Sequence, residues 1–417
     1  MINVAVIGYG VVGSGVVEII KKNCASISKK AGKEIKVKKV LDIRDFDDTC
    51  PDKELLTKNP QDVFDDESIS IIVETIGGAR IAYDYTKRAL ESGKHVVTSN
   101  KELVATHGPE LLRIAKGNNI NYLFEASVGG GIPIIRPLNR CLAANEIYSI
   151  VGILNGTTNY ILSQMKREGK DFDVALKEAQ KNGYAEGDPT ADIEGHDACR
   201  KIAILSSIAY NEFVDYKDIH TEGITKVTLT DMKYAESLNA SIKLIAMSEK
   251  IGDRVVARVS PAIVGKDNPL CNVEDVFNAI VVKGDAVGEA MFYGRGAGKL
   301  PTASAVVADV IEIVKNWGSC GGYDWKVSES SNMMDIMESR AKYLVRLKVS
   351  NEEGAKELVN SLYDNVEWLK PLKVQDKNEI AFVTGKFSEK EHSENFEALG
   401  KSKSVVEIAN TIRILDE

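Results

Sequence analysis

The chain has 417 residues, of which 44% are hydrophobic and 27% charged, and its formal net charge is −8. This length suits two or three domains, and the acidic balance argues against a general nucleic-acid-binding protein. No run is apolar for long enough to cross a membrane, no basic and apolar leader precedes the first predicted strand, and the six cysteines form no C-x-x-C pair. We therefore expect a cytoplasmic protein with reduced thiols and no membrane partner.

Residues 1–130 alternate short apolar runs with amphipathic segments. The predicted strands are Val4–Ile7, Ile35–Leu41, Ile69–Val73, His95–Thr98 and Ile120–Phe124. The predicted helices include Val11–Ile20, Ile81–Ser92 and Pro109–Lys116. Strands rich in β-branched residues that alternate with helices are typical of a parallel sheet covered on both faces. The sequence therefore predicts an α/β fold whose N-terminal part, residues 1–130, is a doubly wound Rossmann-type domain.

A glycine-rich run, Gly8–Gly13, lies between the first predicted strand and the first predicted helix. In the pattern G-x-G-x-x-G, the first glycine allows a tight turn, the second lets the backbone approach a pyrophosphate, and the third allows close helix packing. The alternative is a turn that binds nothing, but the flanking strand and helix favour a bound NAD or NADP. The residues expected at the cofactor here are Gly8, Gly10, Val11, Val12 and Gly13.

Polar residues follow the later strands of this domain, where ligands of parallel sheets bind. Asp42 can accept a hydrogen bond from a ribose 2′-hydroxyl, which favours NAD, whereas Arg44 can pair with a 2′-phosphate, which favours NADP. We lean to NADP, and a solvated strand end is the alternative for both residues. Thr75 follows the third strand and is expected in the nucleotide cleft, and Lys101 follows the fourth strand, where it can lie between nicotinamide and substrate.

From residue 131 the pattern changes to a mixed α+β domain that we place at 131–320. We expect a helix over Ile132–Ala144, a strand over Ile147–Leu154 and then two or three helices to about Tyr210. Further strands are expected at Ser241–Met247, Arg254–Ile263, Phe277–Lys283 and Ala286–Tyr293, and a helix at Thr302–Trp317. A linker over 321–339 then leads to a module, 340–417, whose βαββαβ pattern is typical of a ferredoxin-like fold.

Three polar residues in the second domain have the chemistry of an amino-alcohol site. Glu186 lies in a turn rich in glycine, aspartate and proline, while Asp197 and Lys201 are four residues apart on a predicted helix and share a face. An ordinary ion pair on a solvated helix would look the same at that spacing. The apolar stripe beside them and the nearby acidic turn favour a site that binds an ammonium group and moves a proton.

Five segments together carry a resemblance to the homoserine dehydrogenase family. They are Thr98–Leu103, Gly152–Leu162, Tyr184–Pro189, His196–Lys201 and Gly294–Thr302. The resemblance spans residues 1–320, and the module at 340–417 is more loosely similar to the ACT regulatory domain, with Asn351–Gly354 in place of its Asp-x-Pro-Gly turn. The resemblance to homoserine dehydrogenases implies that Glu186 and Asp197 hold the substrate and that Lys201 transfers a proton, with Lys101 as a second cation.

The same resemblance implies further ligands and partners. Gly183 and Gly298 would approach the cofactor, and the helix at Thr302–Trp317 would return to the nucleotide domain. A structural sodium ion would be held by carbonyl oxygens of Glu125, Val128, Gly130 and Ile132. The family interconverts L-homoserine and L-aspartate 4-semialdehyde on the route to threonine, methionine and isoleucine. A homodimer or higher homo-oligomer is expected, with an amino-acid effector such as threonine at the module.

Two other interpretations stay open at this point. An aspartate-semialdehyde dehydrogenase would need an activated cysteine, but Cys141 and Cys199 lie in predicted helices without the expected glycine turn. A non-catalytic nucleotide or amino-acid sensor would keep the glycine loop and the module, yet it would have no need of Glu186 and Lys201. The sequence leaves open whether the module binds threonine, another amino acid or no ligand.

Overall fold

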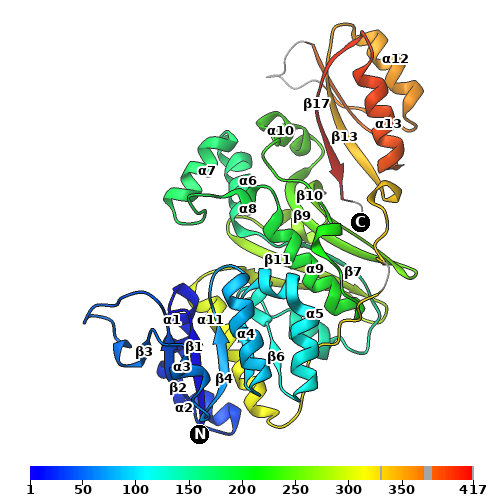
Figure 1. Cartoon of the computed structure of the whole chain (residues 1–417). Helices are drawn as coiled ribbons and strands as arrows, with labels where there is room; N and C mark the ends of the chain where they lie inside the picture. Colours follow the sequence, from blue (N-terminus) through cyan, green and yellow to red (C-terminus); the bar gives the residue numbers. More distant parts are fainter. Residues whose placement is uncertain (329–330, 371–377, 416–417) are drawn as a thin grey trace. The chain divides into compact units, whose positions relative to one another are not determined.

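The structure, a computed structural model, describes residues 1–328, 331–370 and 378–415. The chain forms two compact units, and each is described by itself. The first consists of Met1–Tyr148, Arg200–Tyr216 and Val281–Ser331, and the second of Ser149–Cys199, Lys217–Ile280 and Asn332–Glu417. Figure 1 follows the chain through the elements of both units. No helix in the described ranges is long and apolar enough to cross a membrane.

The first unit is built on a parallel sheet with the strand order β3-β2-β1-β4-β5-β6. Its strands are β1 (Ile2–Ile7), β2 (Ile35–Leu41), β3 (Leu56–Thr57), β4 (Ile69–Glu74), β5 (His95–Thr98) and β6 (Tyr122–Leu123). This is the order of a doubly wound nucleotide-binding fold, so the predicted fold class is confirmed. The order reverses between β1 and β4, and such sheets bind ligands at the carboxyl ends of the strands beside that point.

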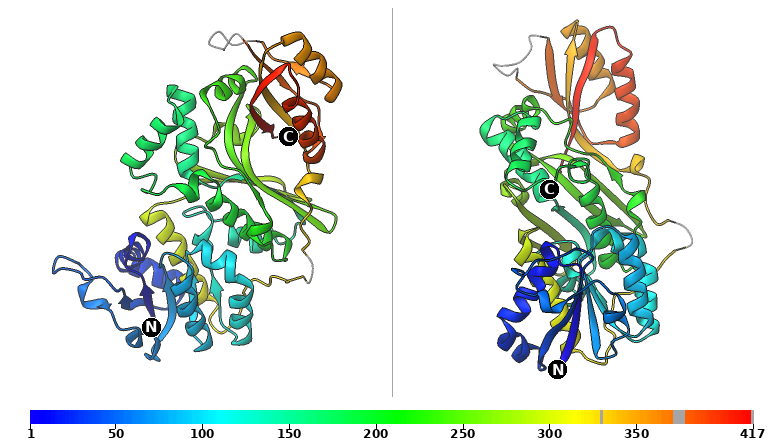
Figure 2. Two further views of the ribbon diagram at one scale, coloured as in Figure 1. Left: turned by 45° about the horizontal axis from the view of Figure 1, so that its top comes forward. Right: turned by 60° about the vertical axis from the view of Figure 1, so that its left-hand side comes forward.

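Helices cover both faces of this sheet. They are α1 (Val11–Lys22), α2 (Cys24–Ala31), α3 (Gln61–Phe64), α4 (Arg80–Glu91), α5 (Lys101–Gly117) and α11 (Lys299–Lys315). Buried side chains of α1 and α11, such as Val16 and Val306, share one core with Val4 and Val6 of β1, and α4 and α5 lie on the opposite face (Figure 2). The predicted return of the late helix to the nucleotide domain is therefore confirmed.

Two helix predictions need correction. The helix expected at Pro109–Lys116 is the second half of α5, which begins at Lys101 because the Asn100 side chain caps it by accepting a hydrogen bond from the Leu103 amide. The helix expected over Ile132–Ala144 is only a short π-helix, Pro137–Cys141. The Glu125 carboxylate binds the backbone amides of residues 134–136, which sets a late start for this helix.

The elements that follow mix helices and strands, with four helices between Gly156 and Tyr210 where two or three were expected. The helices are α6 (Gly156–Glu168), α7 (Phe172–Lys181), α8 (Thr190–Ile193), α9 (His196–Tyr210) and α10 (Leu229–Ser237). The strands are β7 (Ile147–Ile153), β8 (His220–Thr221), β9 (Ala240–Ile251), β10 (Arg254–Gly265), β11 (Phe277–Gly284) and β12 (Gly288–Arg295). β9 and β10 form a long antiparallel hairpin, and β7 runs antiparallel to β9. Short 3-10 helices lie at Lys53–Leu55, Glu125–Ser127, Tyr216–Asp218, Pro269–Asn272 and Ile336–Glu338.

The C-terminal residues form the predicted ferredoxin-like topology. The elements are β13 (Arg340–Val349), α12 (Glu352–Leu362), β14 (Glu367–Trp368), β15 (Glu379–Val383), β16 (Phe387–Ser388), α13 (Glu389–Gly400) and β17 (Val405–Ile414). The strand order is β17-β13-β15-β14, and β16 pairs with β13. Both helices bury apolar side chains against the same face, where Ala355 and Val359 of α12 and Leu399 of α13 meet Tyr343 and Val345 of β13. β17 also pairs in parallel with β10, so the module shares a sheet with the rest of its unit.

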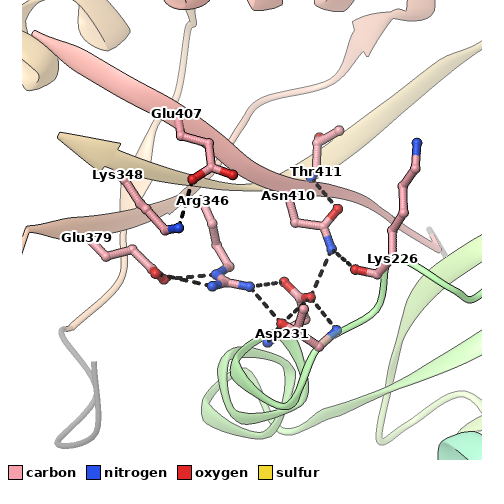
Figure 3. Close-up of polar contacts among 9 residues, drawn as sticks. Lys226, Asp231, Arg346, Lys348, Glu379, Glu407, Asn410 and Thr411 are labelled. Carbon is pink, nitrogen blue, oxygen red and sulfur yellow. Dashed lines mark hydrogen bonds and ion pairs between the residues drawn. The ribbon is translucent and has the colours of Figure 1, made fainter. Parts of the chain in front are cut away.

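A buried ion network joins this module to α10 within the second unit (Figure 3). Arg346 of β13 pairs with Glu379 of β15 at 2.9 Å and with Asp231 of α10 at 2.6 Å. Asp231 also forms the capping box of α10 with Thr228, and it accepts a hydrogen bond from the Asn410 amide at 2.8 Å. Because Arg346 and Asp231 are 5% and 0% exposed, each charge depends on the other for solvation.

Candidate active site

The loop between β1 and α1 has the geometry of a nucleotide-binding turn. Gly8 has a φ of +95°, and a Cβ there would lie 2.8 Å from the carbonyl oxygen of Thr75. A Cβ on Gly13 would lie 1.8 Å from the carbonyl oxygen of Gly8, so only glycine allows the first turn of α1 to pack on the loop. A Cβ on Gly10, the N-cap of α1, would meet no heavy atom of the described residues within 4 Å, which leaves its backbone open to a pyrophosphate.

Thr75 braces this glycine loop from the end of β4. Its hydroxyl donates hydrogen bonds to the carbonyl oxygens of Ile7, at 3.0 Å, and Gly8, at 2.8 Å. Val11 and Val12 begin α1, so their amides belong to the helix N-terminus, where backbone N–H groups have no intrahelical acceptor. The structure thus brings together all the residues that were predicted at the pyrophosphate.

Asp42 and Arg44 follow β2 and differ in how far their side chains are exposed. Asp42 accepts hydrogen bonds from the Tyr9 amide at 2.7 Å and from the Arg44 guanidinium at 2.8 and 2.9 Å. The bonded guanidinium lowers the pKa of Asp42 to about 2. The side chain of Asp42 is 7% exposed and that of Arg44 is 55% exposed. The carboxylate is therefore occupied by the glycine loop and by Arg44, while the guanidinium faces solvent.

A second hydrogen-bonded group ties together the carboxyl ends of β4 and β5. The buried Glu74 carboxylate accepts bonds from the Ile76 amide and from the Thr98 hydroxyl, both at 2.5 Å. The Asn100 amide donates to the carbonyl oxygens of Ile76 and Gly78 at 3.2 and 2.7 Å. Burial raises the pKa of Glu74 to about 7. This network fixes the loop after β4 and the residue before Lys101, which is half-buried in the first turn of α5.

The predicted cation loop is buried in the first unit. Gly130 has a φ of +56°, and a Cβ there would lie 2.2 Å from the carbonyl oxygen of Gly296. The Glu125 carboxylate accepts hydrogen bonds from three amides at 2.7–2.8 Å, so its side chain is already occupied. Val128 and Ile132 are 1% and 2% exposed. Any ion here would therefore bind main-chain carbonyl oxygens, and the described residues contain no cluster of three or more His, Cys, Asp or Glu able to hold a metal.

Carboxylates converge on the start of α6 in the second unit. Asn155, the N-cap of α6, donates its two amide hydrogens to Asp192 at 2.7 Å and to Asp197 at 2.8 Å. The Thr157 hydroxyl donates to the carbonyl oxygen of Tyr184 at 2.6 Å. These bonds place the acidic turn that carries the exposed Glu186 beside the same helix start.

Helix α9 carries Asp197 and Lys201 one turn apart, and the two are 5% and 9% exposed. An ion pair on a solvated helix face would be far more exposed, so the simple surface interpretation is wrong. The neighbouring Ala198, Ile202 and Leu205 are buried, as the predicted apolar stripe requires.

The remaining predicted cofactor residues lie at turns of positive φ. Gly298, the N-cap of α11, has a φ of +124° and belongs to the first unit. Gly183 has a φ of +74°, directly follows the C-cap of α7 and belongs to the second unit. Both are positions that favour glycine, with or without a bound cofactor.

Sequence reasoning missed part of this site. The turn that begins at Asn155 is expected from the sequence to cap a helix and to bind a carboxylate or the cofactor, but the bonds of Asn155 to Asp192 and Asp197 were not foreseen. Asp192 was not singled out at all, because a single aspartate in a short helical turn has no distinctive spacing. The available signal was the repetition of acidic residues around Asp197, which a one-dimensional pattern cannot assign to a common point in space.

Several known proteins similar to this chain are homoserine dehydrogenases. The family models "Homoserine dehydrogenase, NAD binding domain" and "Homoserine dehydrogenase" match residues 8–125 and 133–311. The homoserine dehydrogenase of Bacillus subtilis (strain 168) is 39% identical over 424 residues, which cover 99% of this chain and 98% of that protein. A crystal structure of a homoserine dehydrogenase from Thiobacillus denitrificans has a TM-score of 0.91 at 35% identity and covers 100% of this chain, with 98% of its own chain covered.

A hyperthermophilic archaeal homoserine dehydrogenase mutant, solved in complex with NADPH, is also similar. Its TM-score is 0.65 at 32% identity, over 76% of this chain and 98% of that one. The chain that carries the glycine loop after β1, the acidic groups beside α6 and the lysine of α9 therefore matches homoserine dehydrogenases. These matches favour that family over an aspartate-semialdehyde dehydrogenase or a sensor. The chain belongs to the homoserine dehydrogenase family and is an NAD(P)-dependent oxidoreductase that acts on a small molecule.

Proposed function

We propose that Asp197, Glu186 and Lys201 perform the dehydrogenase reaction between L-homoserine and L-aspartate 4-semialdehyde, on the route to threonine, methionine and isoleucine. The observation that carries this proposal is the arrangement on α9. Asp197 is buried, its carboxylate is bonded to Asn155, and Lys201 follows one helical turn later. On one buried helix face, the Asp197 carboxylate can bind the substrate ammonium, and the Lys201 ammonium can exchange a proton with the alcohol oxygen of the substrate.

In the proposed mechanism, Asp197 and Glu186 bind the ammonium group that substrate and product share. During reduction the aldehyde oxygen gains negative charge, and the Lys201 ammonium stabilises that charge and donates the proton. A bound NAD(P) would supply the hydride for reduction and accept it in oxidation. Oxidation would require Lys201 to release its proton first, helped by Lys101 as a second cation. We therefore expect reduction to L-homoserine to be the favoured direction near neutral pH.

We further propose that NADP is the preferred cofactor. The Asp42 carboxylate is occupied by the Tyr9 amide and by Arg44, so it is poorly placed to accept a ribose hydroxyl. The Arg44 guanidinium is the more exposed partner, and it has the donor geometry that a 2′-phosphate needs. The NADPH-bound archaeal relative agrees with this choice.

The other partners belong to the same proposal. A monovalent cation such as sodium would be held by carbonyl oxygens of Glu125, Val128, Gly130 and Ile132, in a loop where the glutamate side chain is already occupied. The ferredoxin-like module is proposed as an ACT-like domain with an amino-acid effector such as threonine. A homodimer or a higher homo-oligomer is proposed from the family resemblance. None of the six cysteines forms a disulfide, which suits the proposed cytoplasmic location.

The substrate role of Asp197 is tested by the Asp197→Asn variant, which keeps the shape of the side chain and removes its charge. We expect the KM for L-homoserine to rise about tenfold or more, with the KM for NADP⁺ unchanged, since hydrogen bonds to charged groups are among the strong ones. Asp173→Asn, an exposed aspartate in the first turn of α7, is the matched control. An unchanged KM for L-homoserine in a folded Asp197→Asn enzyme would refute the role.

A further inference from the structure

The Asn155 side chain is buried and uses each of its hydrogen-bonding groups for a separate purpose. Its Oδ1 accepts a bond from the Thr158 amide at 2.8 Å, which caps α6. Its Nδ2 donates one hydrogen to Oδ1 of Asp192 at 2.7 Å and the other to Oδ2 of Asp197 at 2.8 Å. With 5% of the residue exposed, Asn155 lies between two aspartates that are five residues apart in the chain.

The capping role alone does not explain this choice of residue. Asparagine, aspartate and serine cap helices about equally well, so any of them would serve the Thr158 amide. Only asparagine supplies an acceptor and two donors on one short side chain. Aspartate would add a third negative charge beside the two carboxylates, and serine could donate to only one of them.

Two neighbouring carboxylates need such a bridge to keep a fixed geometry. Like charges at short range repel each other and favour protonation of one partner. An NH₂ group that donates to both carboxylates offsets this repulsion and fixes the orientation of each side chain. Because Asp197 and Lys201 share a face of α9, a fixed Asp197 also sets where the alcohol of a bound substrate lies relative to Lys201.

We infer that Asn155 is a positioning residue for the substrate: its amide bridge holds Asp192 and Asp197 in the orientation that binds the substrate ammonium. This inference rests on the proposed substrate role of Asp197. Asn155 itself acts through the two carboxylates and takes no part in proton or hydride transfer. The prediction is that loss of the bridge, with the helix cap kept, weakens substrate binding and leaves cofactor binding unchanged.

The test uses Asn155→Ser, which keeps a side-chain acceptor for the Thr158 amide and removes the amide bridge. We expect the KM for L-homoserine to rise about tenfold or more, because serine can keep at most one of the two bonds to charged groups and cannot bridge them. The dissociation constant of NADPH and the far-UV circular dichroism should match the wild type. Asn351→Ser is the matched control, since Asn351 caps α12 through the Gly354 amide in the same way and its KM should be unchanged without effector.

A double-mutant cycle with Asp197→Asn separates this inference from the proposed function. If both hold, Asn155→Ser has a smaller effect in the Asp197→Asn background than in the wild type, because part of the bridge acts through that carboxylate. If Asp197→Asn raises the KM for L-homoserine and folded Asn155→Ser does not, the positioning role is refuted and the substrate role stands. If the two effects are fully additive, Asn155 acts independently of Asp197 and the inference is overturned. If Asp197→Asn itself leaves this KM unchanged, the proposed function fails first.

Discussion

At the residue scale, Asp42 and Arg44 form one ion pair in which the two side chains have different roles. The carboxylate fixes the glycine loop through the Tyr9 amide, and the guanidinium is left toward solvent. Such an arginine is able to bind a 2′-phosphate with two parallel hydrogen bonds, which a lysine or a neutral residue would not reproduce. The choice between NAD and NADP is therefore expected to depend on Arg44.

Arg44→Ala is expected to raise the KM for NADPH about tenfold or more and to change the KM for NADH little, because only NADPH carries the phosphate. Steady-state reduction of L-aspartate 4-semialdehyde with each cofactor measures both constants. Arg88→Ala is the matched control, since Arg88 also forms an exposed pair, with Asp65. Equal changes for both cofactors in Arg44→Ala would contradict the assignment.

Glu74 gives a pH dependence whose sign follows from burial. Its pKa is raised to about 7, so the folded protein keeps this proton to higher pH than the unfolded chain does. The contribution of Glu74 to the free energy of unfolding is therefore complete at low pH and is lost as the pH rises from about 5 to 7. Glu74→Gln stays neutral and should remove this loss, which amounts to about 3 kcal/mol at most.

Urea unfolding of wild type and Glu74→Gln at several pH values between these limits measures the difference. Glu110→Gln is the control. The hydrogen bond with Lys87 lowers the pKa of Glu110, so this substitution removes no carboxyl group whose pKa is raised. Parallel stability curves for wild type and Glu74→Gln would show that the carboxyl group is ionised when folded, against the argument from burial.

At the element scale, sequence periodicity predicted strands better than helix starts. The run Ile35–Leu41 was predicted at the bounds that β2 has, because β-branched residues between polar segments mark a buried strand. The predicted helix Pro109–Lys116 missed the start of α5, which begins at Lys101 directly after its N-cap Asn100. Side chains distant in sequence, such as Glu125 beside residues 134–136, set helix starts that periodicity does not contain.

The site was predictable where residue type and spacing carry the chemistry. The glycines of the first loop, and the lysine four residues after Asp197, follow local rules of turns and helices. The bridge from Asn155 to Asp192 and Asp197 spans 37 and 42 residues, and only the packing of α6 against the segment before α9 creates it. No local pattern encodes a contact of that range.

The joint between the C-terminal module and α10 is predicted to depend on one buried arginine. Arg346→Met leaves the Asp231 and Glu379 carboxylates buried and without their guanidinium, which costs about 3–5 kcal/mol of unfolding free energy. Lys348→Met is the control on the same strand, because the pair of Lys348 and Glu407 is exposed and is worth about 0–1 kcal/mol (Figure 3). Chemical denaturation compares them, and similar losses in the two variants would contradict a special role for the buried network.

At the scale of the whole molecule, the second unit contains Glu186, Asp197 and the ferredoxin-like module, whereas Lys201 belongs to the first unit. The last strand of the module, β17, pairs in parallel with β10 through Ala262 and Ile263, and Arg413 of β17 bonds Glu222 at 2.8 Å. An effector bound to the module would therefore act on a sheet that it shares with the catalytic part. The ion pair of Arg346 with Asp231 is a further contact between the module and the rest of that unit.

In the proposed mechanism, Lys201 transfers the proton while other residues hold substrate and cofactor. The most direct measurement is the single-turnover rate of NADPH oxidation with L-aspartate 4-semialdehyde in wild type and Lys201→Ala, with Lys177→Ala on the exposed face of α7 as control. We predict a rate about 100-fold or more below wild type in Lys201→Ala, with NADPH binding unchanged and the control at the wild-type rate. A folded Lys201→Ala enzyme that turns over at the wild-type rate would contradict the account.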